Sequence, residues 1–559
     1  LTYSLALPSI PQGTMIDVDN NGTDNKGVQI FAAAYWSNVW GDPFLERRDG
    51  TGWSNSYTSA IVDAGNDDEI TGGTLIVWSP DDKQAFPVGF GSDGLLFTDD
   101  DPTAPIPAGY NLVDLNQEPF RVYKESQPSL SLNEGVSEVN DYSEMNYSDS
   151  FQALFDKVSQ EYPFTLDKGI DWGAINAQFS PIVANAKNKD DYYRALRDMT
   201  YAIPDGHVNV SINPDVFYEE GGGGFGLVLA ELSDGRVIVT QVLPNTPGEK
   251  AGIKPGAEIL AWNNTPVSQV LGSITPYFGP YSTEHTKREE QVNFLNRVPP
   301  GTQIDVRYKN PGESSDKTTS MKAEVEYESL FETIPFFNQD ELAIPLEGEV
   351  LDESGLGYMR ISTFSDDYNF MARLWDHYIQ ALIDEEVPGL IIDLRTNGGG
   401  SVGLSLDYAG YFFDEEIELY DRLYYNETTG DFESTGEPAK IKPGPLFYDG
   451  PIAVLVSPNC VSACEGFAYA LAQQGRSTIV GHYPSAGAFG EVGRGQYKLP
   501  DEITMQFPTG RPENLDGDLL IEGLGVLTDV TVPVSQESAL GLVDAVLEAA
   551  INALIDKIR

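Results

Sequence analysis

The segment 388–400, PGLIIDLRTNGGG, restricts the fold more than any other short stretch of this chain. Its LIIDL run is almost entirely apolar and does not alternate with polar residues, which is typical of a strand buried on both faces of a parallel sheet. Two further apolar runs, 450–457 and 476–481, follow it. Because helical segments separate these runs, residues 326–559 are predicted to form an α/β domain with a covered sheet.

Helical periodicity supports this prediction. Apolar residues recur at three- and four-residue spacing in 369–386 and in 538–558, so both segments are expected to be amphipathic helices. Another helix should begin near Ala463, after the strand at 450–457. The C-terminal helix is expected to be able to pack on the sheet.

The pattern changes three times before residue 326, and a chain of 559 residues is too long for one core. Residues 1–135 contain short β-type runs between turn clusters, which predict a small antiparallel β domain of unknown role. Residues 136–220 form a helical segment that ends in an extended run carrying His207. Residues 221–325 return to β-type runs around one short helix. We therefore expect a multidomain α/β protein.

The stretch 17–25, DVDNNGTDN, begins like a calcium-binding loop. Asp17, Asp19 and Asn21 stand at ligand positions, but Val28 occupies the twelfth position, where a bidentate Glu belongs. An ordinary turn rich in Asp, Asn and Gly explains the stretch better, so no metal is expected there.

The charge of the chain excludes one class of partner. Its 86 acidic residues exceed its 34 basic residues by 86 − 34 = 52, and such a field repels the phosphates of nucleic acids. No window approaches 18 consecutive apolar residues, so no transmembrane segment is expected. The chain begins with Leu and shows no leader pattern. We expect a secreted protein, extracellular or periplasmic, whose signal segment is absent from this chain.

Ser462 is the first candidate for chemistry. It lies in SPNCVSACEGFAYAL, where an apolar strand changes into a helical pattern. Free N–H groups and the positive end of a helix surround nucleophilic serines at such turns, although a helix-capping Ser fits this segment equally well. The glycines that end the strand at 388–400 allow close approach of their N–H groups to a ligand, which suits an oxyanion hole.

A serine hydroxyl needs a neighbouring base, which a third group holds in place. His207 follows a helix stop and lies at an element junction, where functional side chains are common. His482, at the end of a strand, is its only serious rival, because His285 and His377 are expected to be structural or surface residues. Glu522 lies among apolar residues and glycines, a setting that by itself is more typical of a surface carboxylate at a turn.

Only two cysteines occur, Cys460 and Cys464, so no disulfide framework holds the fold. Full helical spacing would separate their Cβ atoms by about 5–6 Å, beyond the roughly 3.8 Å of a relaxed disulfide. We therefore favour two small buried residues that pack the turn. A bridge is conceivable because Cys460 precedes the helix.

Residues 221–325 closely resemble a bacterial PDZ domain, through AGIKPGAEILAWNNTPV. The resemblance implies a loop that receives the C-terminal carboxylate of a peptide on backbone N–H groups. Its residues would be Gly224, Phe225, Gly226 and Leu227. A spacer or a gate is the alternative role for this domain.

Residues 140–559 resemble the carboxy-terminal processing and tricorn-type serine peptidases. Three segments carry the resemblance, in the order and spacing of the family: LIIDLRTNGGG, NCVSACEGFAYAL and IEGLGVLTDVTVP. It implies a core of the crotonase-like (ClpP/crotonase) type, with Ser462 at the reactive position. The processing branch uses a Lys 25 residues beyond the Ser as its base. Gly487 stands there, at 487 − 462 = 25, so the Ser–Lys dyad is missing.

The tricorn-like branch, which includes the chlamydial protease-like activity factor, uses a His from before the PDZ domain and a Glu about sixty residues beyond the Ser. His207 and Glu522 match this pattern, the latter at 522 − 462 = 60. Tricorn has a Ser directly before its His, where this chain has Gly206. The connection of Glu522 to the imidazole therefore stays open: direct, through water, or through another side chain.

The resemblance implies a serine endopeptidase that cleaves extended or unfolded polypeptides through an acyl-enzyme, with PDZ-assisted recognition and no cofactor. The catalytic residues would be Ser462, His207 and Glu522, and the oxyanion hole would use the N–H groups of Ala463 and of Gly398 or Gly399. Polypeptides, presented by their C-terminal tails or otherwise, are the expected partners, and a homo-oligomer is an open alternative. A non-catalytic peptide- or ligand-binding protein on the same fold is the main rival; an acyl-CoA enzyme is more remote.

Overall fold

The computed structural model contains two compact units, Leu1–Val139 and Asn140–Arg559. The described residues are 7–11, 15–18, 27–36, 56–63, 69–98, 100–125, 129–134, 140–334, 344–365, 368–426, 429–434, 436 and 438–558. Most of the calcium-like stretch 17–25 lies outside them, so that expectation is not addressed by the structure.

The first unit is built from antiparallel strands. Its main sheet has the order β1-β5-β8-β9, with β4 also paired to β5. These strands are β1 (Gln29–Phe31), β4 (Ala60–Asp63), β5 (Glu69–Ser79), β8 (Gly109–Asp114) and β9 (Arg121–Tyr123). Two small sheets join β2 (Ala34–Trp36), β3 (Ser56–Thr58) and β10 (Asn133–Glu134), and β6 (Ala85–Pro87) with β7 (Thr103–Pro105).

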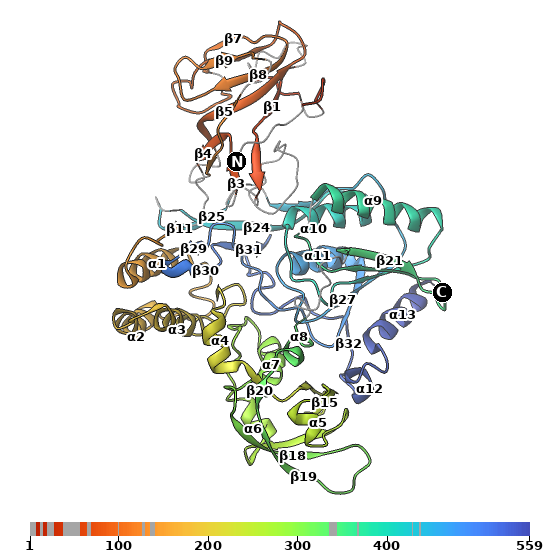
Figure 1. The fold of residues 1–559 in the computed structure, drawn as a ribbon. Coiled ribbons are helices and arrows are strands. Elements are labelled where there is room, and N and C mark those ends of the chain that lie inside the picture. Colours follow the sequence, from red (N-terminus) through yellow and green to blue (C-terminus); the bar gives the residue numbers. More distant parts are fainter. Residues whose placement is uncertain are drawn as a thin grey trace. The chain divides into compact units, whose positions relative to one another are not determined.

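The second unit begins with three helices that pack together (Figure 1): α1 (Tyr147–Glu161), α2 (Trp172–Ala184) and α3 (Lys189–Thr200). Each starts at an Asn or Asp whose side chain accepts a hydrogen bond from the third residue of the helix. They share a core with a sheet of order β11-β29-β30-β12. Its strands are β11 (Asn140–Asp141), β29 (Gln496–Lys498), β30 (Thr504–Gln506) and β12 (Asn209–Val210). Because β12 begins two residues after His207, this sheet ties His207 to a segment about 300 residues later in the chain.

The PDZ-like region contains a six-stranded antiparallel sheet of order β14-β15-β16-β18-β19, with β17 paired to β16. The strands are β14 (Leu227–Glu231), β15 (Val237–Val242), β16 (Glu258–Trp262), β17 (Thr265–Pro266), β18 (Gln303–Lys309) and β19 (Lys317–Lys322). The same region also contains helices and a pair of short strands. The helices are α4 (Pro214–Gly221), α5 (Pro247–Lys250), α6 (Val267–Leu271), α7 (Glu284–Phe294) and α8 (Glu328–Phe331), and the paired strands are β13 (Gly223–Gly224) and β20 (Glu324–Val325). Strand β14 lies at an edge of this sheet, and α7 packs against it.

The last region is an α/β sheet of order β21-β22-β23-β27-β28-β32, parallel except for the antiparallel edge strand β21. Its strands are β21 (Leu346–Val350), β22 (Gly357–Ile361), β23 (Leu390–Asp393), β27 (Ile452–Val456), β28 (Ser477–Gly481) and β32 (Val530–Thr531). Ile392 and Val454 face a core shared with α9 (Tyr368–Asp384), α10 (Val402–Ala409) and α11 (Ala463–Ala472). Ile391 and Leu455 face α13 (Ala545–Ile558). The predicted multidomain α/β architecture with a covered sheet is confirmed.

Two details of this region differ from or extend the prediction. The segment 538–558 is not one helix, because α12 (Gln536–Ala539) ends before Gly541, whose φ is 67°, and α13 begins at Ala545. A separate antiparallel sheet joins β24 (Ile417–Asn426), β25 (Asp431–Ser434), β26 (Ala439–Ile441) and β31 (Gly510–Asn514). Within the described ranges, none of the helices has the length and apolar character that a membrane crossing requires.

Candidate active site

Ser462 lies at the turn between β27 and α11, with φ 60° and ψ −124°. A positive φ is unfavourable for a residue with a Cβ and is found at strained functional turns. Nucleophilic serines use this kind of strand-to-helix turn to expose their hydroxyl. The Ser462 N–H donates to Ala488 O at 3.1 Å and to Glu465 Oε2 at 3.2 Å. These two acceptors fix the orientation of the Ser462 N–H. The half-buried side chain lies at the N-terminus of α11.

Two backbone N–H groups beside Ser462 are candidates for an oxyanion hole. Ala463 is the first residue of α11, so its N–H has no carbonyl within the helix to bond. Gly399, with φ 95°, packs so closely that an added Cβ would lie 2.8 Å from Ser462 Cβ. Its N–H donates to Asn397 Oδ1 at 2.8 Å, whereas the Gly398 N–H donates to no other described residue. Gly398 is therefore the better candidate donor of the two glycines.

Gly487, the position of the Lys in the processing branch, has no room for a side chain. Its φ is 73°, and an added Cβ would lie 2.5 Å from Thr283 Cγ2 and 2.9 Å from Gly525 N. The Gly487 N–H donates to Glu465 Oε1 at 2.7 Å. The fold here thus excludes a base at residue 487.

Glu465 is a fully buried carboxylate on the first turn of α11. Besides the N–H groups of Ser462 and Gly487, it accepts hydrogen bonds from Ser485 Oγ at 2.6 Å and Ala488 N at 2.9 Å. Burial raises the pKa of Glu465 to about 8, against the effect of these donors. The carboxyl group fastens the loop 485–488 to the Ser462 turn.

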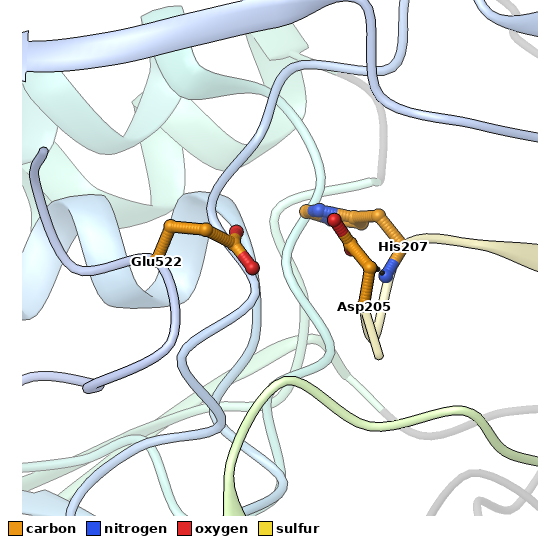
Figure 2. Close-up of side chains that lie close together, drawn as sticks. All are labelled: Asp205, His207 and Glu522. Atoms are coloured by element: carbon orange, nitrogen blue, oxygen red, sulfur yellow. Dashed lines mark hydrogen bonds between the residues drawn. The ribbon is translucent and has the colours of Figure 1, made fainter. Parts of the chain in front are cut away.

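His207, Asp205 and Glu522 come together in the interior (Figure 2). Each offers a ring nitrogen or a carboxylate oxygen, and these atoms lie within 4.8 Å of one another. The three residues are 7%, 0% and 3% exposed, and His207 Nδ1 has no hydrogen-bond partner within the part of the chain that the structure describes. Burial lowers the pKa of His207, while the charge of Asp205 opposes this change. A neutral imidazole is the form that accepts a proton.

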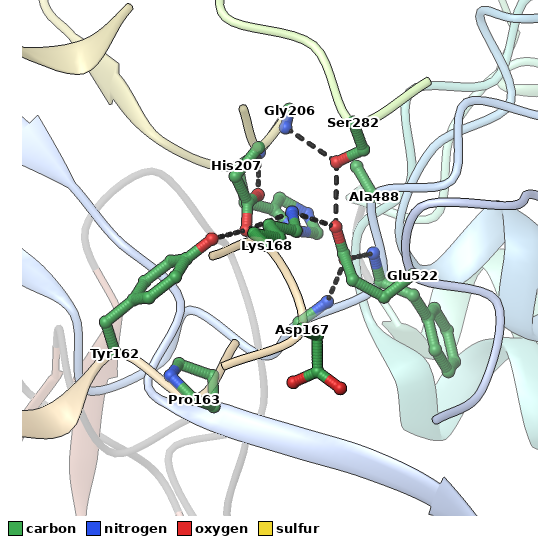
Figure 3. A network of polar contacts seen from close by, with 12 residues as sticks. Tyr162, Pro163, Asp167, Lys168, Gly206, His207, Ser282, Ala488 and Glu522 are labelled. Atoms are coloured by element: carbon green, nitrogen blue, oxygen red, sulfur yellow. Dashed lines mark hydrogen bonds and ion pairs between the residues drawn. The ribbon is translucent and has the colours of Figure 1, made fainter. Parts of the chain in front are cut away.

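Glu522 is connected to the His207 loop through two other side chains (Figure 3). Lys168 Nζ lies 2.5 Å from Glu522 Oε1 and 2.9 Å from Asp205 Oδ2. Ser282 Oγ donates to Glu522 Oε1 at 2.8 Å and accepts the Gly206 N–H at 2.9 Å. Ser282 therefore supplies a hydroxyl beside Gly206 that connects the backbone next to His207 with Glu522.

A short chain of contacts leads from this cluster to Ser462. Gly206 packs against Ala488, since a Cβ added at residue 206 would lie 2.9 Å from Ala488 Cβ. The Ala488 carbonyl in turn accepts the Ser462 N–H. The fold thus brings the two segments into one neighbourhood, although Ser462 and His207 are 462 − 207 = 255 residues apart.

The other histidines have different surroundings. His482 Nδ1 is 2.7 Å from Val532 O. His285, on α7, has Nε2 2.9 Å from Ser485 O and its ring stacks on Tyr483. His377 lies on α9. His207 is the histidine whose ring nitrogen belongs to the buried group with Asp205 and Glu522.

Cys460 and Cys464 form a disulfide, with Cα atoms 5.4 Å apart. Our preference for two packed but unlinked cysteines is therefore wrong, although both residues are fully buried as expected. The helical-spacing argument does not apply, because α11 begins only at Ala463. The bridge closes a ring that contains Ser462.

The PDZ-like loop already contacts an internal carboxylate. Gly226 N donates to Glu326 Oε2 at 3.2 Å, and this carboxylate also pairs with the buried Arg297 at 3.1 Å. On the edge strand β14, the Leu227 carbonyl accepts a hydrogen bond from Asn296. A peptide tail that binds here by strand addition must displace these contacts.

Sequence reasoning missed four residues of this region: Asp205, Lys168, Ser282 and Glu465. Asp205 had a usable signal, because it stands two residues before His207 and its Oδ1 accepts the His207 N–H at 2.8 Å. Glu465 stands three residues beyond Ser462, the spacing of a capping box. Lys168 and Ser282 had no local signal.

Profiles of three known domains match the chain. Peptidase family S41 matches residues 355–532, the tricorn protease C1 domain matches residues 143–200, and the PDZ domain matches residues 215–271. The carboxyl-terminal-processing protease of Picosynechococcus sp. is 25% identical over 394 residues, which cover 67% of this chain and 81% of that protein. The carboxy-terminal processing protease CtpB of Bacillus subtilis is 23% identical over 335 residues, or 60% of this chain and 58% of that protein.

Among solved structures, mature CPAF superposes with a TM-score of 0.54 at 18% identity, over 73% of this chain and 98% of that one. Its complex with lactacystin gives a TM-score of 0.53 at 16% identity, over 74% and 97% of the two chains. These likenesses show a shared fold. The profile matches to peptidase family S41 and to the PDZ domain, with the processing-protease relatives, support a PDZ-containing serine peptidase. Residues 355–532 match the model of peptidase family S41, and the resemblance predicted from the sequence is confirmed.

Proposed function

We propose that this chain is an endopeptidase that cleaves extended or unfolded polypeptides, with Ser462 as nucleophile and His207 as general base. The observation that carries the proposal is the turn at Ser462, whose φ of 60° presents the hydroxyl at the start of α11. Residue 487 is a glycine with no room for a side chain, which supports a His rather than a Lys as the base. We further propose that the core is of the crotonase-like type.

In this mechanism neutral His207 takes the proton of Ser462 as Oγ attacks the scissile carbonyl carbon. The N–H groups of Ala463 and Gly398 stabilise the oxyanion of the tetrahedral intermediate. The imidazolium then protonates the leaving amine, and an acyl-enzyme remains. A water that gives its proton to His207 attacks the ester, and Ser462 regains its proton as the carboxylic acid product departs. Glu522 acts through Lys168 and Ser282 and does not donate or accept the transferred proton.

The compartment and the presentation of substrate follow from other features. Disulfides persist in oxidising compartments, so the Cys460–Cys464 bridge supports an extracellular or periplasmic location. The carboxyl-terminal-processing names of the relatives suggest substrates that are recognised near their C-terminal tails. A binding protein without activity is disfavoured, because binding alone does not require a strained serine turn.

The test begins with a fluorophosphonate probe, which should label the wild-type protein at Ser462 and leave Ser462→Ala unlabelled and inactive on casein. His207→Ala should lower kcat by about 10⁴-fold or more, because it removes the base. His482→Ala is the matched control and should keep nearly full activity. An inactive His482 variant beside an active His207 variant would refute the assignment of the base.

A further inference from the structure

We propose that Lys168 is a positioning residue of this site: its ammonium bridges Asp205 and Glu522 and leaves the cluster one negative charge to receive the His207 imidazolium. This inference rests on the proposed function, because it takes His207 to be the base. It deepens that function by assigning a role to a cation from the C1-like helical segment.

The bridge is buried and well connected. Lys168 lies between α1 and α2, and its side chain is 9% exposed. Its Nζ contacts Asp205 Oδ2 at 2.9 Å and Glu522 Oε1 at 2.5 Å, and it lies 5.3 Å from the centre of the Phe164 ring. The Tyr162 hydroxyl donates to Asp205 Oδ2 at 2.7 Å. Two buried carboxylates without a cation would be strongly unfavourable, so Lys168 is needed for both to stay ionised.

The charges of the cluster balance only when His207 carries a proton. When both carboxylates are ionised, Asp205 and Glu522 contribute −2 and Lys168 contributes +1, so the neutral imidazole faces a net charge of −1. After His207 takes the proton of Ser462, the sum is zero. Burial lowers the pKa of Lys168, but the charges of Asp205 and Glu522 and the hydrogen bonds to them raise it by more. The pKa of Lys168 is therefore raised overall, and the ammonium persists at neutral pH.

The neighbours of His207 act in opposite directions on its basicity. Burial lowers the pKa of His207, Asp205 raises it, and Lys168 lowers it further. Burial and the charge of Asp205 raise the pKa of Glu522 to about 7, while Lys168 opposes them. The four groups therefore titrate as one system. The fall of activity toward low pH, which is the acidic limb of the pH profile, reports the protonation of the whole cluster and not of His207 alone.

A divalent cation would be the alternative occupant of this space, since Asp205, His207 and Glu522 are residue types that bind metals. The ammonium of Lys168 already lies between the two carboxylates. A metal would have to displace it, so the residues present fit a lysine bridge better than a metal site.

The experiment compares pH profiles of kcat/KM for a peptide substrate, and of the rate of fluorophosphonate labelling, between pH 5 and 9. Lys168→Met should move the acidic limb upward by about one pH unit or more, because the variant lacks the positive charge that lowers the pKa of His207. Asp205→Asn should move the limb downward. Lys168→Arg should restore the wild-type limb. Lys157→Met is the matched control, since Lys157 pairs with Glu161 on α1, outside the cluster, and its limb should not move.

Each outcome decides the inference. An active Lys168→Met protein with an unmoved limb overturns it, and so does a limb that moves equally in Lys157→Met. If Lys168→Met does not fold by circular dichroism, Asp205→Asn decides alone, and an unmoved or raised limb in that variant overturns the inference. Activity that survives in Ser462→Ala would instead refute the proposed function, which separates the two failures.

Discussion

Ser462 holds a backbone conformation that serine does not favour. A non-glycine residue in a sparsely populated region of positive φ costs on the order of 1–3 kcal/mol and persists only where its surroundings impose it. The surroundings here are the two hydrogen bonds that its N–H donates, the close packing of Gly399 and the Cys460–Cys464 bridge. The strain is thus stored where the nucleophile is proposed.

This strain predicts a difference between two inactive variants. Ser462→Gly should unfold with a free energy about 1 kcal/mol larger than Ser462→Ala, because glycine adopts positive φ without a Cβ clash. The gain is less than the full strain energy, since glycine also has more freedom in the unfolded chain. Urea denaturation followed by circular dichroism measures the difference. An alanine variant as stable as the glycine variant would show that the turn is not strained.

For single residues, the sequence predicts a role in the candidate site only where the residue lies in a recognisable local pattern. Ser462, Ala463 and Gly398 follow from a strand that changes into a helix and from a strand that ends in glycines. Lys168 could not be predicted, because its partner Glu522 is 354 residues away and only tertiary structure pairs them. The pattern of charges along the chain carries no information about that contact.

Among the elements, the edge strand β14 has the clearest functional consequence. Peptides bind PDZ domains by adding a strand and placing their terminal carboxylate on loop N–H groups. Here Glu326, directly after β20, places its own carboxylate on Gly226 N, and Arg297 neutralises it. A peptide tail that bound at this loop would therefore compete with Glu326 for the Gly226 N–H.

Glu326→Gln should strengthen binding of a peptide with a free apolar C-terminus by about tenfold, or about 1.4 kcal/mol, because the competing charge is gone and Arg297 is left to attract the tail. Calorimetric titration of the full chain measures the affinity. Glu324→Gln is the matched control, since Glu324 is exposed and pairs with Lys250 on the surface. Equal strengthening for the amidated peptide would show that the gain does not come from the carboxylate.

Helices and strands were predicted best from the sequence where an apolar run or a helical period continues without a break. The apolar runs that became β23, β27 and β28 have the composition of strands buried on both faces, and α9 has a regular helical period. The separation of α12 from α13 was missed, because the apolar spacing continues through the segment where the chain leaves the helix at Gly541. The disulfide was missed because the exact start of α11 decides whether the two cysteines share a helix.

The whole molecule carries a formal charge of −52. Such a field attracts cationic chains and repels anionic ones over a distance set by the ionic strength, about 10 Å at 0.1 M salt and 3 Å at 1 M. Substrate capture should therefore depend on the charge of the polypeptide.

A Lys-rich unfolded peptide should be cleaved with a kcat/KM about tenfold higher at 20 mM NaCl than at 1 M NaCl, because association is steered. A Glu-rich peptide of equal length with the same central sequence is the control and should show the reverse trend. Initial rates at both salt concentrations provide the measurement. Parallel salt dependence for the two peptides would exclude steering by net charge.

The cluster around His207 draws Lys168 and Asp205 from before the PDZ domain, Ser282 from within the PDZ-like region, and Glu522 from beyond it. A gene fragment that encoded residues 326–559 alone would carry the proposed nucleophile without its base. A fragment that lost the PDZ domain would lose the hydroxyl beside Gly206. Exchange of single domains between genes would therefore break this site, and the segments that build it must be inherited together.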